Sequence, residues 1–203
     1  MTADRSMNRP IRRFAPFFAV LSLAACGSSP PVHYYSLDPL EITYEPDPEG
    51  APVLDLGPLR MPDYVSRRQM VSRGRGTEVI VDDFNRWAEP LDETVHRIVA
   101  LNVDSLVDGV IVVAYPNRSP IDSSYRLHGS ITRFDAGQDG RAVLIVQWGI
   151  VSADGEVVVA PRRSRYEAQA SRRNDAAEMA RALNDTISQF SRDIAGRIEA
   201  EKL

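Results

Sequence analysis

Cys26 is the residue most clearly placed for chemistry, and it is the single cysteine of the 203-residue sequence. It follows Leu23, Ala24 and Ala25, and this Leu-Ala-Ala-Cys run is typical of a lipobox. The thiol of such a cysteine accepts a diacylglycerol group, and cleavage before it frees an amine that can also be acylated. We therefore predict lipidation of Cys26, and the alternative is a buried cysteine behind an ordinary signal peptide.

The residues before Cys26 have the organisation of a secretory leader. Four arginines precede a short apolar run at residues 14–23, and translation can begin at Met1 or at Met7. Because a membrane span needs about 20 apolar residues, the run predicts a cleaved signal peptide over residues 1–25. Its removal takes away four arginines and one aspartate, so the formal net charge changes from −4 to −7. This acidic balance argues against a nucleic-acid-binding protein.

The residue after the cysteine predicts the destination of the anchored protein. Bacterial lipoproteins with an aspartate at this position remain in the inner membrane, whereas this chain has Gly27. Several acyl chains on one cysteine are enough for stable anchoring. We expect lipid anchoring to the outer membrane, on its periplasmic face.

Few side chains outside the leader are arranged for catalysis. His33, His96 and His128 have no second ligand at metal-binding spacing, and the sequence contains no nucleophile elbow, phosphate loop or dinucleotide-binding glycine pattern. The adjacent carboxylates Asp82 and Asp83 point to opposite faces of a strand and cannot share a proton. We expect no enzyme activity, no cofactor and no metal.

Two segments are richer in contact-forming side chains than a simple connection requires. Residues 84–91 contain Arg86, Trp87 and Glu89 before a proline, and residues 61–70 contain Tyr64 and Arg67. A tryptophan at a strand-to-helix junction usually belongs to the core, with Arg86 and Glu89 pairing or capping the helix. The alternative is that these five side chains bind a partner protein.

Turn residues and hydrophobic periodicity predict the elements that hold these segments. A helix starts at Pro90 and stops at Asp108-Gly109, and a second helix, capped by Ser171 or Asn174, buries a stripe of apolar residues. That stripe consists of Met179, Leu183, Ile187, Phe190, Ile194 and Ile198. Strands are expected at residues 33–37, 53–59, 69–72, 78–81, 110–114, 124–134, 141–152 and 156–170, the last three as an antiparallel meander.

These elements predict one compact α/β (α+β) domain after the leader. We expect a mixed, mostly antiparallel sheet flanked by two helices over residues 53–203, and residues 26–52 hold the lipidated cysteine, a tether and a first short strand. The apolar stripe of the last helix should pack on this sheet, although it can also dock a partner or a lipid. Of the 24 basic residues, 23 are arginines, and their scatter through every segment indicates compositional bias rather than phosphate binding.

Several segments together resemble the ABC-type transport auxiliary lipoproteins, the PqiC-like family. The matching segments are the lipobox at Cys26, residues 34–39, residues 59–71, residues 84–91 and residues 125–135, of which the Arg-Trp-Ala-Glu-Pro-Leu run is the most specific. The resemblance implies a non-catalytic outer-membrane lipoprotein. It implies as partners a membrane-anchored MCE-domain protein and an inner-membrane transport subunit, in a system that moves lipids between membranes. It also allows a ring of several copies.

An alternative function uses the same anchor with a different partner. The chain can be an envelope assembly or regulatory lipoprotein that activates another periplasmic machine. A periplasmic enzyme would have to assemble its site from scattered residues. The transport function and the regulatory function both need an anchored domain that holds a partner.

Overall fold

The compact part of the chain begins just after the expected tether. A computed structural model describes residues 30–41, 48–116 and 122–203, and a compact unit comprises Val32–Leu203. Cys26 and the expected signal peptide lie outside the described residues, so their assignments stay predictions.

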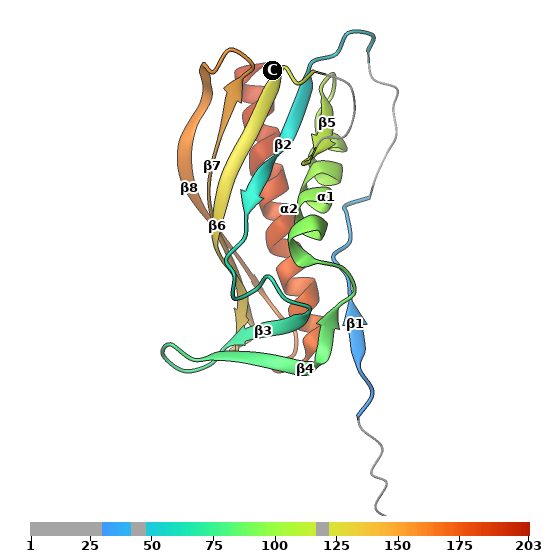
Figure 1. Ribbon diagram of the computed structural model, residues 1–203, viewed down its shortest axis with the longest axis vertical. Helices are drawn as coiled ribbons and strands as arrows, with labels where there is room; N and C mark the ends of the chain where they lie inside the picture. The colour runs from blue at the N-terminus through green and yellow to red at the C-terminus, as the bar shows by residue number, and fades with distance from the viewer. Residues whose placement is uncertain (1–29, 42–47, 117–121) are drawn as a thin grey trace, which may run out of the picture. The chain divides into compact units, whose positions relative to one another are not determined.

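Eight strands form one mixed sheet, which confirms the predicted fold class (Figure 1). Their bounds are β1 His33–Tyr35, β2 Val53–Arg60, β3 Gln69–Arg73, β4 Val79–Trp87, β5 Ile111–Ala114, β6 Tyr125–Gly137, β7 Arg141–Ser152 and β8 Val157–Gln169. The order is β1-β4-β3-β6-β2-β5, and β7 lies between β6 and β8. The predicted meander β6-β7-β8 supplies the longest pairings, all antiparallel.

Strand β6 organises the sheet because three strands pair with it. One of its edges pairs with β7 along nearly its whole length. The opposite edge is shared by β2, which runs parallel to it as far as Ser130, and by β3, which pairs only at Ala136 and Gly137. Residues 131–135 therefore have no partner on that edge among the described strands, and the loop between β2 and β3 lies there.

Strand β4 is longer than the sequence predicts. We expected it to end at Val81, but it continues to Trp87. The reason is that both of its edges are used, since Arg86 pairs with Gln69 of β3 and with Tyr34 of β1. Pairing with two neighbours compensates for the polar residues that interrupt its apolar pattern.

Both helices cover the same face of the sheet (Figure 1). Helix α1, Leu91–Asp104, contacts β2 and β5, whereas α2, Ala176–Glu201, contacts β6, β7 and β8. Helix α1 ends four residues before the predicted stop at Asp108. Its last carboxylate, on Asp104, accepts the N–H of Val112 at 3.0 Å, and the chain turns there toward β5. No described helix is long and apolar enough to cross a membrane.

The apolar stripe of α2 packs on the sheet, as predicted. Phe190 is fully buried, and its ring packs edge-on against Trp148 of β7 and beside Tyr166 of β8. The distances between the ring centres are 5.8 Å and 5.7 Å. The Tyr166 hydroxyl donates to Asp193 of the same helix at 2.6 Å. Burial and this hydrogen bond to a carboxylate raise the pKa of Tyr166. Together these contacts hold α2 against β7 and β8.

The N-terminal cap of α2 differs from the prediction. Its cap is Asp175, whose carboxylate accepts the N–H groups of Ala177 and Glu178 at 3.0 and 3.2 Å. Asn174, one of the two predicted caps, instead takes a positive φ of 56°, which turns the chain into the helix. The aspartate therefore satisfies the first free N–H groups.

We predict that Asp175→Ala lowers the free energy of unfolding by about 1 kcal/mol, because two helical N–H groups lose their acceptor. Thermal melting should show a decrease of about 2–4 °C for a chain of this length. Asp185→Ala, on an exposed part of the same helix, is the matched control. Equal melting temperatures for the two variants would contradict the assignment of the cap.

Candidate functional site

Segments that carry the family resemblance meet where β4 ends. The N–H of Trp87 donates to the carbonyl of Arg68 at 2.7 Å, and the N–H of Ala88 donates to the carbonyl of Tyr35 at 2.8 Å. The Trp87 side chain is only 4% exposed and belongs to the core. The prediction that Trp87 packs at this junction is confirmed.

Arg86 and Glu89 bind different partners rather than each other. Arg86 donates from Nε to the carbonyl of Asp83 at 3.1 Å. Glu89 pairs with Arg97 of α1 and accepts from the hydroxyl of Thr94 at 3.4 Å. Among the described residues no side chain caps the first turn of α1, so the expected cap is absent, and Glu89 instead holds the helix entry through its contacts with Thr94 and Arg97. Pro90, expected as the first helical residue, precedes the helix, and its carbonyl accepts the N–H and the hydroxyl of Thr94 at 3.0 and 2.9 Å.

Several side chains near this junction point into solvent. Tyr34 is 57% exposed and Phe84 is 44% exposed, both unusual for aromatic residues. Tyr34 of β1 is paired with Arg86 of β4. Arg67 is exposed in the loop before β3, and the next residue, Arg68, accepts the N–H of Trp87. We call Tyr34, Arg67, Phe84, Arg86 and Glu89 the junction residues.

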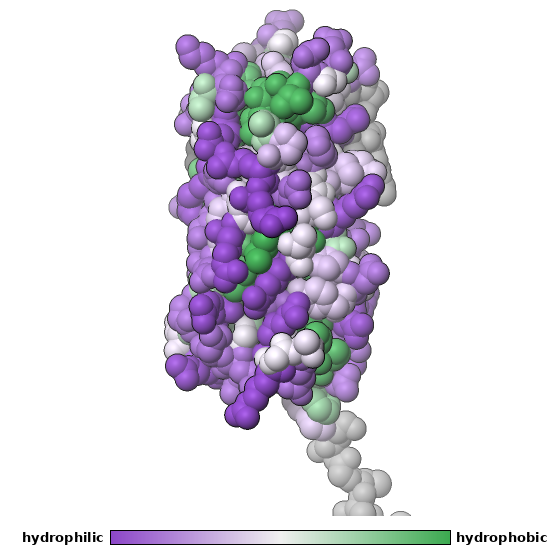
Figure 2. All heavy atoms as spheres, turned by 90° about the vertical axis from the view of Figure 1, so that its left-hand side faces the viewer, coloured by the Kyte–Doolittle hydropathy of each residue, from purple (hydrophilic) through white to green (hydrophobic). Residues whose placement is uncertain are grey.

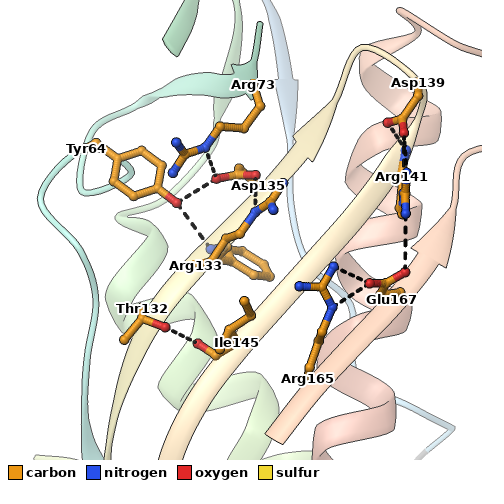
Figure 3. Close-up of polar contacts among 11 residues, drawn as sticks. Tyr64, Arg73, Thr132, Arg133, Asp135, Asp139, Arg141, Ile145, Arg165 and Glu167 are labelled. Carbon is orange, nitrogen blue, oxygen red and sulfur yellow. Dashed lines mark hydrogen bonds and ion pairs between the residues drawn. The ribbon is translucent and has the colours of Figure 1, made fainter. Parts of the chain in front are cut away.

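Tyr64 occupies the unpaired edge of β6. Its hydroxyl donates to the carboxylate of Asp135 at 2.6 Å and accepts the N–H of Phe134 at 3.4 Å (Figure 3). Burial, and then the hydrogen bond to Asp135, raise the pKa of Tyr64, so the phenol stays protonated and keeps donating. The side chain thus replaces a missing strand at a single point.

Asp135 is a fully buried carboxylate with donors from three segments. Besides Tyr64, it accepts from Nε of Arg73 on β3 and from Nε of Arg133 on β6, each at 2.9 Å (Figure 3). The hydrogen bond to Asp135 raises the pKa of Arg73, whose guanidinium also lies 5.0 Å from the centre of the Tyr64 ring. A buried charge requires this kind of compensation.

The same two arginines line an open pocket on the face of the sheet away from the helices. The pocket has a volume of about 620 Å³, and five arginines line it, Arg73, Arg75, Arg133, Arg141 and Arg165. We call this the arginine pocket. Figure 2 looks at the side of the molecule where β7 and β8 lie in Figure 1, and it shows mostly hydrophilic residues there.

Two carboxylates neutralise part of this charge. Arg141 donates to Asp139 at 2.9 Å and lies 4.0 Å from Glu167, which also pairs with Arg165 (Figure 3). The hydrogen bond from Arg141 lowers the pKa of Asp139. These pairs keep the guanidinium groups extended across neighbouring strands.

The sequence contained a signal for the arginine pocket that we attributed to compositional bias. Arg133 and Asp135 are two residues apart on one strand, as are Arg165 and Glu167 on another, and such pairs share a face. Strand β7 lies between these two strands, and its Ile145 pairs with Arg133 on one side and with Arg165 on the other. Alternation on each strand therefore indicated a charged outer face.

His96 has a structural role. Its Nε2 accepts the N–H of Leu59 at 2.8 Å, so its proton lies on Nδ1, which donates to the carbonyl of Asp92 at 2.6 Å. Within the part of the chain that the structure describes, no group of three His, Cys, Asp or Glu residues is placed to hold a metal ion.

Comparison with known proteins identifies related chains. Residues 35–195 match the family model described as ABC-type transport auxiliary lipoprotein component. The intermembrane transport lipoprotein PqiC of Escherichia coli is 24% identical over 155 residues, which cover 75% of this chain and 81% of that protein. The protein of the same name from Shigella flexneri matches equally well.

Solved structures support the fold. An uncharacterised protein superposes with a TM-score of 0.70 at 22% identity, covering 83% of this chain and 99% of that one. A protein from Xanthomonas campestris superposes with a TM-score of 0.67 at 18% identity, covering 84% of this chain and 97% of that one. At these identities the likeness shows a shared fold.

We predict that Tyr64→Phe lowers the free energy of unfolding by about 1–3 kcal/mol, because Asp135 loses a buried donor and the N–H of Phe134 loses its acceptor. Denaturant titration measures this difference. Tyr34→Phe is the control, since its hydroxyl has no hydrogen bond to the described residues and its ring is exposed. If both variants unfold like the unmodified protein, Tyr64 does not support the unpaired edge.

Proposed function

The chain belongs to the ABC-type transport auxiliary lipoprotein component family, and on this basis we propose that it is the outer-membrane docking subunit of an MCE-type system for intermembrane lipid transport. The supporting observation is the family match, which spans most of the compact unit from Val32 to Leu203. Curated relatives covered over 81% of their length are intermembrane transport lipoproteins. A non-catalytic role, holding a partner at the membrane, accounts for an anchored domain of this kind.

The junction residues are the surface that we assign to the partner, a membrane-anchored MCE-domain protein that itself contacts an inner-membrane subunit. Exposed aromatic and arginine side chains dominate protein interfaces because they bury large areas and donate several hydrogen bonds. Tyr34, Phe84 and Arg86 supply these groups, and Arg67 and Glu89 add charge. Trp87 lies beneath them and fixes the backbone that presents Arg86.

The lipid anchor allows a low-affinity contact with the partner to be sufficient for docking. A tether from Gly27 to Val32 spans about 20 Å at most when extended. Confining the domain to this distance from the membrane raises its effective concentration toward a partner that reaches the same membrane. Stable docking then requires less binding energy from the junction residues.

We predict that the double variant Arg67→Glu, Arg86→Glu weakens co-purification of the MCE-domain protein from solubilised envelopes by about tenfold, equivalent to about 1.4 kcal/mol. Arg67 is exposed and Arg86 is half-buried, and neither forms an ion pair with the described residues, so the charge reversal should change the melting temperature by only about 2 °C or less. Arg163→Glu, exposed on β8, is the matched control.

Full recovery of the MCE-domain protein with the double variant would overturn the assignment of this surface. Recovery of a different periplasmic machine by the unmodified protein, with no MCE-domain protein, would favour the regulatory alternative and reject the transport assignment.

A second prediction concerns the anchor. Cys26→Ser should remove the protein from the outer-membrane fraction, because serine provides no thiol for acyl transfer. Gly27→Asp should move the lipidated protein toward the inner membrane in a species with the usual sorting rule. Sucrose-gradient fractionation and mass spectrometry of the N-terminal peptide measure both effects. A Cys26→Ser protein that fractionates normally would show that Cys26 is not the anchor.

A further inference from the structure

We propose that the arginine pocket binds a phosphate group, as carried by an anionic lipid headgroup or by a free phosphate. This inference concerns the face of the sheet away from the helices and does not depend on the proposed docking role. It would give the domain a direct contact with the phosphate chemistry of the envelope, in addition to its anchor.

Charge is the first argument. The protein as a whole has a formal net charge of −4, yet five arginines line this pocket and Asp139 is the one carboxylate among its lining residues. Counting the adjacent Glu78, Asp135 and Glu167 as well, five positive groups face four negative ones. A local positive excess on an acidic protein attracts anions to this pocket.

The geometry of the donors is the second argument. Arg73 and Arg133 both reach the buried carboxylate of Asp135 through Nε, and their terminal nitrogens make no hydrogen bond to the described residues. Asp135 thus fixes two guanidinium groups while their outer N–H groups remain available. Guanidinium groups bind phosphate through pairs of parallel hydrogen bonds, and holding them in place beforehand reduces the entropy lost on binding.

The other three arginines of the pocket are free to bind a phosphate or can exchange an exposed ion pair for one. The side chain of Arg75 makes no ion pair with the described residues. Arg141 and Arg165 pair with Asp139 and Glu167, but all four side chains are between 38% and 53% exposed. Exposed ion pairs contribute at most about 1 kcal/mol, so a phosphate can compete for these guanidinium groups.

The shape of the pocket suits a group larger than phosphate alone. Its volume of about 620 Å³ lies in the usual range of small-molecule sites. Gly76 forms part of the rim with no atom within 4 Å of its side-chain position, so a ligand can approach the backbone there, whereas the carboxylates of Glu78 and Asp139 lie against Gly74 and Gly137. Val143, only 2% exposed, also lines the pocket. A phosphate that carries a glycerol group fits this combination of cationic walls and bare rim.

The test uses the full-length lipoprotein in a neutral detergent and isothermal titration calorimetry. One arm titrates inorganic phosphate, and the other titrates micelles of the same detergent doped with phosphatidylglycerol, with phosphatidylcholine micelles as the reference. The variant is Arg75→Gln, Arg165→Gln, which spares the two arginines that support Asp135. The control is Arg163→Gln, exposed on β8 two residues from Arg165 but outside the pocket.

We expect the double variant to bind at least fivefold more weakly, the control to stay within twofold, and all melting temperatures to agree. Binding of phosphatidylglycerol but not of inorganic phosphate identifies a lipid headgroup as the ligand, and binding of inorganic phosphate identifies a free anion. The inference is overturned if neither titrant binds, or if the double variant and the control bind equally. Failure here leaves the proposed docking role intact, because the MCE-domain co-purification measures a different surface.

Discussion

The carboxylate of Asp135 lies out of water, and a buried charge persists in a fold only when nearby donors replace the lost solvent. Its three donors come from the loop after β2, from β3 and from β6 itself. They can meet only if β3 continues along the β6 edge that β2 has left. The compensation of one charge therefore fixes where the β2–β3 loop runs, how β3 is placed and how two arginines face solvent.

The hairpin of β3 and β4 connects the two surfaces to which we assign functions. Gln69, at the start of β3, pairs with Arg86 among the junction residues, and Arg73, at its end, lines the arginine pocket. A five-residue strand thus has the partner surface at one end and the anion pocket at the other. A partner that shifts β3 along β6 would alter the distance between Arg73 and Asp135.

Local patterns predicted the elements of this fold well, and long-range contacts explain what they missed. Alternation and turn residues gave β6, β7 and β8, and helical periodicity gave the buried stripe that includes Phe190. Alternation assigns a residue to a face but does not choose its partner strand, so the parallel pairings of β1 and β2 were not predicted. Tyr64 was singled out as a contact residue, but its hydrogen bond to Asp135, 71 residues away in the sequence, was not predicted.

The position of β6 late in the chain has a consequence for the order of folding. Leu56 of β2 pairs with Leu127, and Ser72 of β3 pairs with Ala136. Both strands therefore pair with a segment more than 60 residues further along the chain. Such non-local pairings slow folding, whereas the meander of β6, β7 and β8 forms from neighbouring residues. During synthesis or export from the N-terminus, β2 and β3 emerge before the strand that completes their hydrogen bonds. The first half of the chain therefore completes its sheet hydrogen bonds only after β6 arrives, and β6 is the template on which β2 and β3 pair.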